Sequence, residues 1–373
     1  MKYENISESL YIKGRIGWKG LKKGEYLKTG DYRIINGSNI SNGVIDWSNC
    51  GYITKQRYFE SPEIMLKKGD ILITKDGTIG KVAIVNKLEY PSTIASGLFI
   101  LRNNVPEKWN TLFLYYYLQT NRFKEFVHSR TEGSVIPHLY QKDFENLEIP
   151  YISLTEQYKI SSKLDLIQRK ISLNRQINDN LLDIAQNIYH RILFSSQITK
   201  TNLRSFATVI MGQSPSSKTY NKNKIGIPLL NGAADFRNGI HPSKWTTDPK
   251  IIVNKGAYIF GVRATIGLTA KVSKPYAIGR GTGSAIPKDV NNEEILYFIL
   301  NDMFKKFEQT ESGSVYINIS KNDFENYKFY IPDRNGLLFF HEKVKPIMDQ
   351  IYINKKQNKI LQAIKATLLS KIF

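Results

Sequence analysis

The 373-residue sequence has a single cysteine, Cys50, and no long apolar segment. One thiol cannot form an internal disulfide or a thiolate metal cluster, and it suits a reducing compartment. No segment reaches the ~18 apolar residues that a membrane-spanning helix needs, and the first ten residues, MKYENISESL, lack the apolar core of a signal peptide. These absences predict a soluble, cytoplasmic protein.

Catalytic and cofactor motifs are also missing. The sequence has no GxxxxGK[ST] phosphate loop, and its five histidines show no HExxH or other metal-ligand spacing. It also lacks an acidic-plus-lysine nuclease pattern and the Asn-Pro-Pro-aromatic signature of adenine methyltransferases. The glycine-rich stretch GRGTG (279–283) has no strand-loop-helix context, so we interpret it as a turn beside DNA phosphates. We predict no catalytic residue, no metal and no cofactor.

Acidic residues are in the minority. Lys and Arg number 53 against 33 Asp and Glu, which gives a net charge of +20. Such a surplus favours a polyanionic partner, because each neutralised phosphate releases condensed counterions. The alternative is a solvated basic surface in a lysine-rich proteome. A hydrophobic content of 41% still supports a packed fold.

What the sequence does contain is an internal repeat. Gly-Ser-Val (133–135) and Asp-Phe-Glu-Asn (143–146) recur at 313–315 and 323–326, displaced by 180 residues. A period this long indicates duplicated domains and not stacked small repeats. The chain length also fits two domains.

Both copies show the same order of predicted elements. Strands run into Asn-Gly turns near 36 and 231, hairpins span 67–85 and 254–272, helices cover 112–126 and 295–307, and closing strands end at Ile-Pro pairs, 149–150 and 331–332. The offset between the copies falls along the module from about 195 to 187 to 180. The framework is therefore shared, while the loops differ in length.

An apolar stripe with steps of four and three residues follows each copy, at 160–192 and 344–372. The two stripes keep the same register 180 residues apart, so we predict two long helices packed antiparallel on each other, as in a coiled coil.

Four asparagines and one proline interrupt these stripes. Asn174 and Asn178 match Asn354 and Asn358, and we predict that they fix the helix register; the alternative is a solvent-exposed edge. Pro346 predicts an irregularity in the second helix, because proline lacks the amide hydrogen that a helix interior needs.

Several local sequences resemble, in order and spacing, the specificity subunit of type I restriction-modification systems. They are GRIGWKGL (14–21), RIINGSNI (33–40), KKGDILITKDGTIG (67–80), IPHLYQKDFENLEIP (136–150) and LTEQYKI (154–160). The duplicated layout extends the resemblance over nearly the whole chain. The second copy departs from it, with LLFFHEKV (337–344) in place of the Glu-Gln signature, which puts the symmetry of methyltransferase docking in question.

The resemblance implies an α+β fold with two duplicated mixed α/β target recognition domains separated by two long helices. We assign the first recognition domain to 1–152, the first spacer helix to 153–196, the second recognition domain to 197–333 and the second spacer helix to 334–373. Such a subunit is not catalytic. It reads bipartite double-stranded DNA with one domain per half-site, uses the helices as a ruler, docks two methyltransferase subunits and can be joined by a restriction subunit. The alternatives are a stand-alone tandem-domain DNA-binding regulator and an RNA-binding or scaffold protein.

Loop and turn residues are the candidates for DNA contact, because framework strands are committed to the core. In the first copy they are Asn36, Ser38, Asn39, Lys75, Asp76, Thr78, Lys81, Arg130, Ser134, His138, Tyr140 and Lys142. In the second copy they are Asn231, Arg237, Asn238, Arg263, Thr265, Arg280, Thr282, Ser314, Tyr316, Asn318 and Lys321. Asn and Arg suit base edges, whereas Lys, Ser and backbone amides suit phosphates.

Some candidates have a competing structural role. Asn36 and Asn231 are better explained as turn formers, whereas Lys75 and Arg263, in corresponding turns, are better explained as DNA contacts. The aromatic residues at 115–117 and 297–298 fall on helices and are expected in the core.

Overall fold

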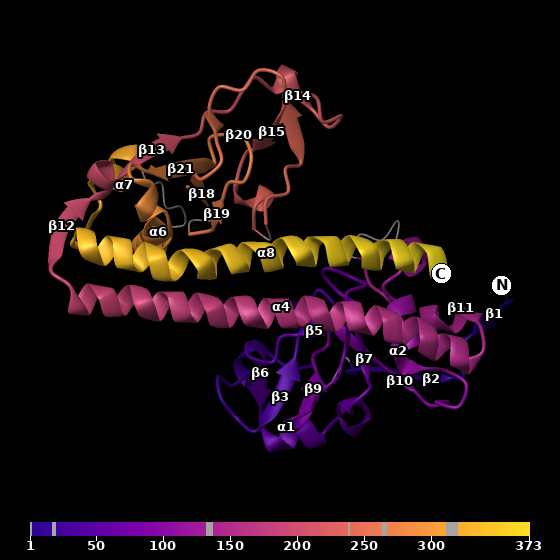
Figure 1. Cartoon of the computed structure of the whole chain (residues 1–373). Coiled ribbons are helices and arrows are strands. Elements are labelled where there is room, and N and C mark those ends of the chain that lie inside the picture. The colour runs from indigo at the N-terminus through magenta and orange to yellow at the C-terminus, as the bar shows by residue number, and fades with distance from the viewer. Residues whose placement is uncertain (1, 17–19, 132–136, 238, 263–266, 311–319) are drawn as a thin grey trace. The chain divides into compact units, whose positions relative to one another are not determined.

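The computed structural model describes residues 2–16, 20–131, 137–237, 239–262, 267–310 and 320–373. The chain divides into two compact units, unit 1 with Met1–Leu173 and Gln357–Phe373, and unit 2 with Asn174–Lys356. Each unit joins one globular module to parts of two long helices, α4 (Leu154–Ser195) and α8 (Arg334–Ile372) (Figure 1). Within the described ranges, no helix is both long and apolar enough to cross a membrane.

The module of unit 1 is built on an antiparallel four-stranded sheet with a smaller sheet beside it. The four strands, in spatial order, are β2 (Leu10–Gly14), β10 (Leu98–Asn103), β7 (Ile71–Thr74) and β8 (Val82–Ile84). The smaller sheet places β3 (Tyr32–Ile35) between antiparallel β6 (Gly51–Ile53) and parallel β9 (Ser92–Ile94). Two separate pairs of short strands complete the module: β1 (Lys2–Asn5) with β11 (Glu148–Tyr151), and β4 (Ile40–Ser41) with β5 (Val44–Ile45). The β-branched sequences of β7, β8 and β9 are buried on both faces, as continuous apolar strands require.

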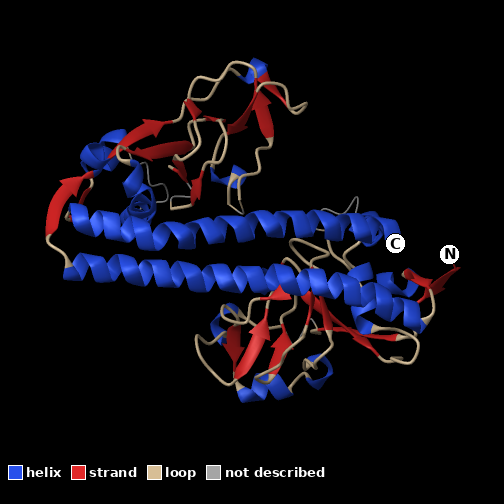
Figure 2. Ribbon diagram, viewed as in Figure 1, coloured by secondary structure: helices blue, strands red, loops and turns tan. Residues whose placement is uncertain are grey.

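Unit 2 repeats this strand order. Its four-stranded sheet contains β13 (Ala207–Met211), β21 (Thr282–Pro287), β18 (Tyr258–Gly261) and β19 (Thr269–Lys271), and β12 (Ile198–Asn202) pairs with β22 (Lys328–Pro332). The second sheet has five strands, in the order β14 (Tyr220–Asn221), β16 (Lys244–Thr246), β15 (Ile227–Leu230), β20 (Tyr276–Ile278) and β17 (Ile252–Val253). Since β15 runs parallel to β20 as β3 does to β9, the duplication predicted from the sequence is confirmed in the topology. Figure 2 shows that both modules contain strands, apart from the two long helices.

Helices cover the four-stranded sheets. Unit 1 has α2 (Thr111–Tyr117) and α3 (Asn121–Thr131) where one helix was predicted, and unit 2 has α6 (Glu293–Thr310). Shorter helices are α1 (Lys55–Phe59), α5 (Leu203–Phe206) and α7 (Lys321–Asn326). The side chains of Tyr115, Tyr116 and Tyr117 are buried, so the aromatic run belongs to the core, as expected.

Within each unit the two long helices run antiparallel, as predicted. In unit 1, Asn358 donates to the Ile171 carbonyl at 3.2 Å, and Lys365 donates to Gln168 Oε1 at 2.7 Å. In unit 2, Asn354 donates to Asn178 Oδ1 at 2.9 Å. All four stripe asparagines are buried, which contradicts the alternative of a solvent-exposed edge.

Helix α8 continues through Pro346 without a break, so the predicted irregularity does not interrupt it. Proline removes only one backbone hydrogen bond, and the neighbouring Val344 and Ile347 pack into the core of unit 2. We attribute the continuity to this packing, which outweighs the local preference of proline.

Candidate nucleic-acid interface

Four loops meet at the β7–β8 turn of unit 1. The Leu139 amide donates to the Lys75 carbonyl at 3.1 Å, and the Lys75 amide donates to the Gly97 carbonyl at 2.9 Å. The Lys81 ammonium donates to the Gly37 carbonyl at 3.4 Å, which adds the loop after β3. Loops that lie far apart in the sequence therefore form one surface, which we call the unit 1 loop surface.

A row of predicted contact residues lies on this surface. His138 Nδ1 is bonded to Asp76 Oδ1, and the His138 ring centroid lies 4.6 Å from that of Tyr140. The Lys142 ammonium is 5.8 Å from the Tyr140 ring centroid. The Tyr140 side chain is 53% exposed although it is aromatic. The row thus offers a carboxylate, an imidazole, an aromatic ring and an ammonium group from two segments.

The Lys75 ammonium is partly buried. Burial lowers the pKa of its ammonium, and the nearby Asp76 carboxylate opposes that shift. The ammonium lies 4.8 Å from the centroid of the Phe99 ring, and no acidic side chain in the described ranges forms a salt bridge with it. A partly desolvated cation of this kind gains from an anionic ligand.

In unit 2 a smaller cluster joins Asn231, Ser214 and Arg280. The Ser214 hydroxyl donates to Asn231 Oδ1 at 3.2 Å, and the Arg280 amide donates to Ser214 Oγ at 3.2 Å. The backbone amide of Asn231 donates to Asp235 Oδ2 at 2.9 Å, in agreement with the predicted turn role. The Arg280 side chain is exposed beside these groups.

The glycines next to Arg280 are required by packing. A Cβ at Gly279 would lie 2.0 Å from Asn231 Oδ1, and one at Gly281 would lie 2.5 Å from the Asn231 carbonyl. A Cβ at Gly283 would lie 2.4 Å from the Phe260 ring. The predicted turn is present, because the Thr282 amide donates to the Gly279 carbonyl at 2.9 Å, and strand β21 begins at Thr282.

Two predicted contact residues are buried and are withdrawn from the candidate set. Thr282 has no exposed surface and donates to the Leu230 carbonyl at 3.1 Å. Asn39 is buried as well; its Oδ1 accepts from the Asn36 amide at 2.9 Å and its Nδ2 donates to the Asn49 carbonyl at 2.9 Å. DNA cannot reach either side chain without displacing these bonds.

The remaining candidates fall into three groups. Exposed side chains outside the clusters above are those of Ser38, Thr78, Arg130, Arg237 and Lys321. Asn36 is half-buried before the 3-10 helix Gly37–Asn39, as its turn role requires. Seven candidates lie outside the described residues, namely Ser134, Asn238, Arg263, Thr265, Ser314, Tyr316 and Asn318, as do both Gly-Ser-Val loops.

The correspondence between Lys75 and Arg263 is also corrected. The Val262 amide donates to the Gly281 carbonyl at 3.2 Å, as the Lys75 amide does to Gly97. Lys75 therefore corresponds to Val262, and the counterpart of Arg263 is Asp76.

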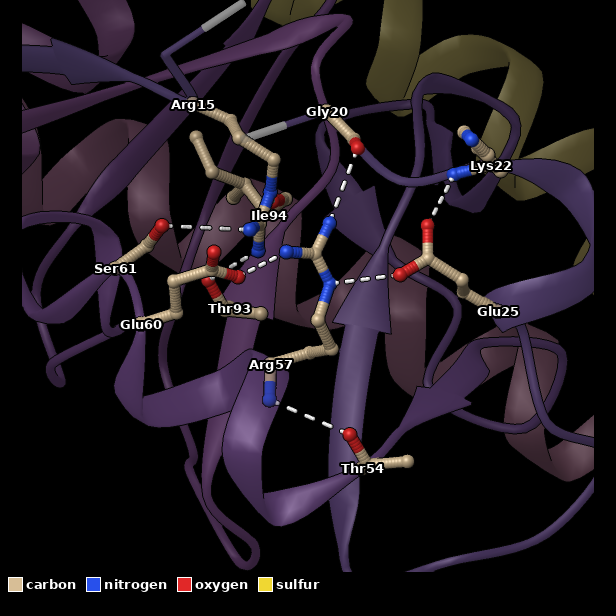
Figure 3. Close-up of polar contacts among 10 residues, drawn as sticks. All are labelled: Arg15, Gly20, Lys22, Glu25, Thr54, Arg57, Glu60, Ser61, Thr93 and Ile94. Atoms are coloured by element: carbon tan, nitrogen blue, oxygen red, sulfur yellow. Dashed lines mark hydrogen bonds and ion pairs between the residues drawn. The ribbon is translucent and has the colours of Figure 1, made fainter. Parts of the chain in front are cut away.

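No sequence pattern predicts how the segment with Gly20 and Glu25, which precedes β3, is anchored. Arg57 donates to the Gly20 carbonyl at 3.0 Å and forms ion pairs with Glu25, at 2.9 Å, and Glu60 (Figure 3). The buried Arg15 donates to the Ile94 carbonyl at 3.1 Å (Figure 3). Two arginines thus fix this basic segment of unit 1 to its module.

The Glu-Gln signature of the first copy has a structural role. Gln157 is fully buried; it accepts from the Asn110 amide at 2.8 Å and donates to the Lys108 carbonyl at 3.0 Å. Glu156 bonds to the Ser153 hydroxyl at 3.0 Å at the start of α4. Because Gln157 cannot contact a partner, its replacement by Leu337 in the second copy does not argue against symmetric docking.

Comparisons with known proteins agree over most of the chain. Residues 15–183 and 196–367 match the profile of the family described as type I restriction modification DNA specificity domain. The putative type I restriction enzyme MjaX specificity subunit of Methanocaldococcus jannaschii is 26% identical over 371 residues, which cover 91% of this chain and 85% of that protein. The MjaIX specificity subunit of the same organism is 25% identical over 381 residues, covering 92% and 86%.

A solved structure has the same fold. The crystal structure of the type I restriction-modification system S subunit from M. genitalium superposes with a TM-score of 0.60 over 100% of this chain and 96% of that one. The two sequences are 18% identical, so this likeness concerns the fold alone.

Proposed function

The chain belongs to the family of type I restriction-modification DNA specificity subunits, and we propose that each of its two units reads one half of a bipartite duplex DNA target. The observation that carries this proposal is one strand order built twice with different loop chemistry. A shared framework with divergent loops suits recognition of two different half-sites. The relatives give no support to a stand-alone regulator.

The proposed contacts follow from side-chain chemistry. In unit 1, Asp76 can accept from a cytosine amino group, while His138 and Tyr140 face the same base edges. Lys75 and Lys142 neutralise phosphates beside them. In unit 2 the exposed Arg280, in the cluster with Asn231, suits guanine. Arg237 and Lys321 are further exposed candidates of this unit.

We also propose that each unit docks one methyltransferase subunit through an exposed apolar triad on its parts of the long helices. The triad of unit 1 is Tyr158, Leu173 and Ile364, with side chains 52%, 49% and 45% exposed. The triad of unit 2 is Leu338, Ile353 and Ile184, at 39%, 55% and 49%. The two triads are related residue by residue by the 180-residue repeat. Equivalent surfaces on both units favour two copies of one partner, and a restriction subunit can join that complex.

Charge substitutions test the docking surface. Leu173→Glu and Ile353→Glu should each reduce the complex from two copurified methyltransferase subunits to one, and the double variant should retain none, as measured by light scattering. Leu166→Glu is a matched control, because Leu166 is 68% exposed but its repeat counterpart is Pro346. Unchanged stoichiometry in the double variant contradicts the docking proposal.

Single-molecule methylation mapping tests the function itself. A host that expresses this chain with its methyltransferase should gain methylation at one bipartite motif, and the motif should disappear when the gene is deleted. Methylation that is unaffected by the deletion contradicts the proposed function.

A further inference from the structure

Unit 2 carries a basic turn with an apolar tip between β14 and β15. Lys222, Asn223, Lys224 and Ile225 are all exposed, and Ile225 is 57% exposed. No described acidic side chain pairs with either lysine. The turn projects beyond the five-stranded sheet of unit 2 (Figure 1).

The turn is rigid. The Asn221 side chain spans it, with Nδ2 donating to the Ile225 carbonyl at 2.9 Å and Oδ1 accepting from the Ile225 amide at 3.0 Å. Lys224 has a φ of 63°, which a lysine rarely adopts. A Cβ at Gly226 would lie 2.2 Å from the Thr246 carbonyl, so the turn is packed tightly against β16. Ile225 is therefore held in a fixed position at the tip before any ligand binds.

The equivalent segment of unit 1 is built differently. There Arg57 ties the chain to its module through Gly20 and Glu25, and the exposed turn before β3, at 28–31, reads Lys-Thr-Gly-Asp. That turn has one lysine and one aspartate, and the exposed Leu27 precedes it. At the position that corresponds to Ile225, unit 1 has Gly30 and therefore no apolar side chain.

We propose that this turn is a minor-groove wedge, in which Ile225 inserts at a base step while Lys222 and Lys224 bind the flanking phosphates. The inference rests on the proposed DNA recognition and names a contact beyond the candidate loops. Apolar side chains flanked by cations commonly insert between base steps in this groove.

The length of β15 supports contact with two grooves. The turn precedes Ile227 and the cluster at Asn231 follows Leu230, at the other end of the strand. The four residues of β15 span ~13 Å, and the turn before the strand adds several ångströms to the distance between Ile225 and the cluster. Half a turn of B-DNA is ~17 Å, so one end of β15 can face the major groove while the other reaches the neighbouring minor groove. The cost of unstacking depends on the base step, so the wedge adds sequence preference without a base hydrogen bond.

The test uses the complete complex with its methyltransferase subunits and a duplex that contains the mapped target. With pyrrolocytosine, a stacking-quenched fluorescent base whose added ring faces the major groove, placed at successive positions of the second half-site, the wild-type complex should raise the fluorescence at one step. Ile225→Ala should abolish that signal and weaken binding by roughly 5- to 20-fold, whereas Ile225→Leu should retain both. Ile252→Ala is the matched control, because Ile252 is 41% exposed elsewhere in the unit and should change neither.

Two further measurements test the groove that Ile225 enters and the phosphate contacts of the two lysines separately. Diaminopurine in place of adenine at the wedge step adds an amino group to the minor groove. This change should weaken DNA binding by the wild-type complex at least fivefold but leave the affinity of the Ile225→Ala complex unchanged. Lys222→Ala with Lys224→Ala should make the slope of log affinity against log salt shallower by about 1.8, as expected for two lost phosphate contacts.

The outcomes distinguish the two proposals. If the wild-type complex does not prefer the mapped duplex to a scrambled one, DNA recognition by this chain is wrong. If it does prefer the target, but no step shows a fluorescence change or Ile225→Ala binds within twofold of wild type, the wedge alone is wrong. An equal loss with diaminopurine in both proteins places the tip outside the minor groove and also overturns the wedge.

Discussion

Unit 1 and unit 2 share a strand order but differ in the groups that their loops expose. Unit 1 gathers Asp76, His138 and Tyr140 beside Lys75, whereas unit 2 gathers Asn231 and Arg280 around Ser214. The framework is constrained because its side chains fill the cores, and the loops are free to diverge because their side chains do not. Divergence that is confined to the loops changes the DNA sequence that is recognised, while the framework that positions the loops stays the same.

The two units also differ in backbone packing at one strand end. Strands β2 and β13 are equivalent by their pairing with β10 and β21, so Arg15 corresponds to Gly212. Arg15 carries a long, buried side chain, whereas a Cβ at Gly212 would lie 2.2 Å from the Gly279 carbonyl and 2.6 Å from the Thr282 carbonyl. The end of β2 in unit 1 therefore accommodates a long side chain, whereas backbone atoms occupy the equivalent space at the end of β13 in unit 2.

The largest predicted effect tests that difference. Gly212→Ala should destabilise unit 2 by about 3 kcal/mol, because the contacted atoms are backbone oxygens that cannot rotate away. Chemical unfolding followed by hydrogen exchange should place the loss in unit 2 and not in unit 1. Gly232→Ala is the control, since a Cβ there meets nothing within 4 Å. Equal stability of the two variants would show that β13 and β21 separate easily.

The duplicated framework was predictable because it depends on local patterns. The segment 67–85 alternates apolar, β-branched strands with a Lys-Asp-Gly turn, and it forms the β7–β8 hairpin. The error at Asn39 arises from nearby contacts with Asn36 and Asn49, whereas the error at Thr282 arises from a contact distant in the sequence. Thr282 follows glycines typical of a turn, but its hydroxyl bonds to Leu230, 52 residues away. Asp76 and His138 are 62 residues apart, so no spacing rule predicts that they meet.

An intermediate effect is predicted for the loop chemistry of unit 1. His138→Ala and Asp76→Ala should each weaken discrimination at one half-site by about 2 kcal/mol, because each removes a base-edge or supporting contact, while the other half-site stays unchanged. Methylation mapping of strains carrying each variant measures both half-sites together. Arg280→Ala should show the reverse pattern and relax only the second half-site. Relaxation of both half-sites by one substitution would contradict the assignment of one half-site to each unit.

The smallest predicted effect concerns the seam between the long helices. In unit 2 two side-chain amides pair, Asn354 with Asn178, and in unit 1 Asn358 bonds to the Ile171 carbonyl. If the amide pair fixes the register, Asn178→Ala and Asn354→Ala should couple by about 1 kcal/mol in a double-mutant cycle of unfolding free energies, since either change leaves a buried amide unsatisfied. The exposed neighbour Ile353 supplies the control, because Ile353→Ala should add to Asn178→Ala within about 0.5 kcal/mol. Equal coupling in both cycles would mean that apolar packing, and not the asparagine pair, sets the register in unit 2.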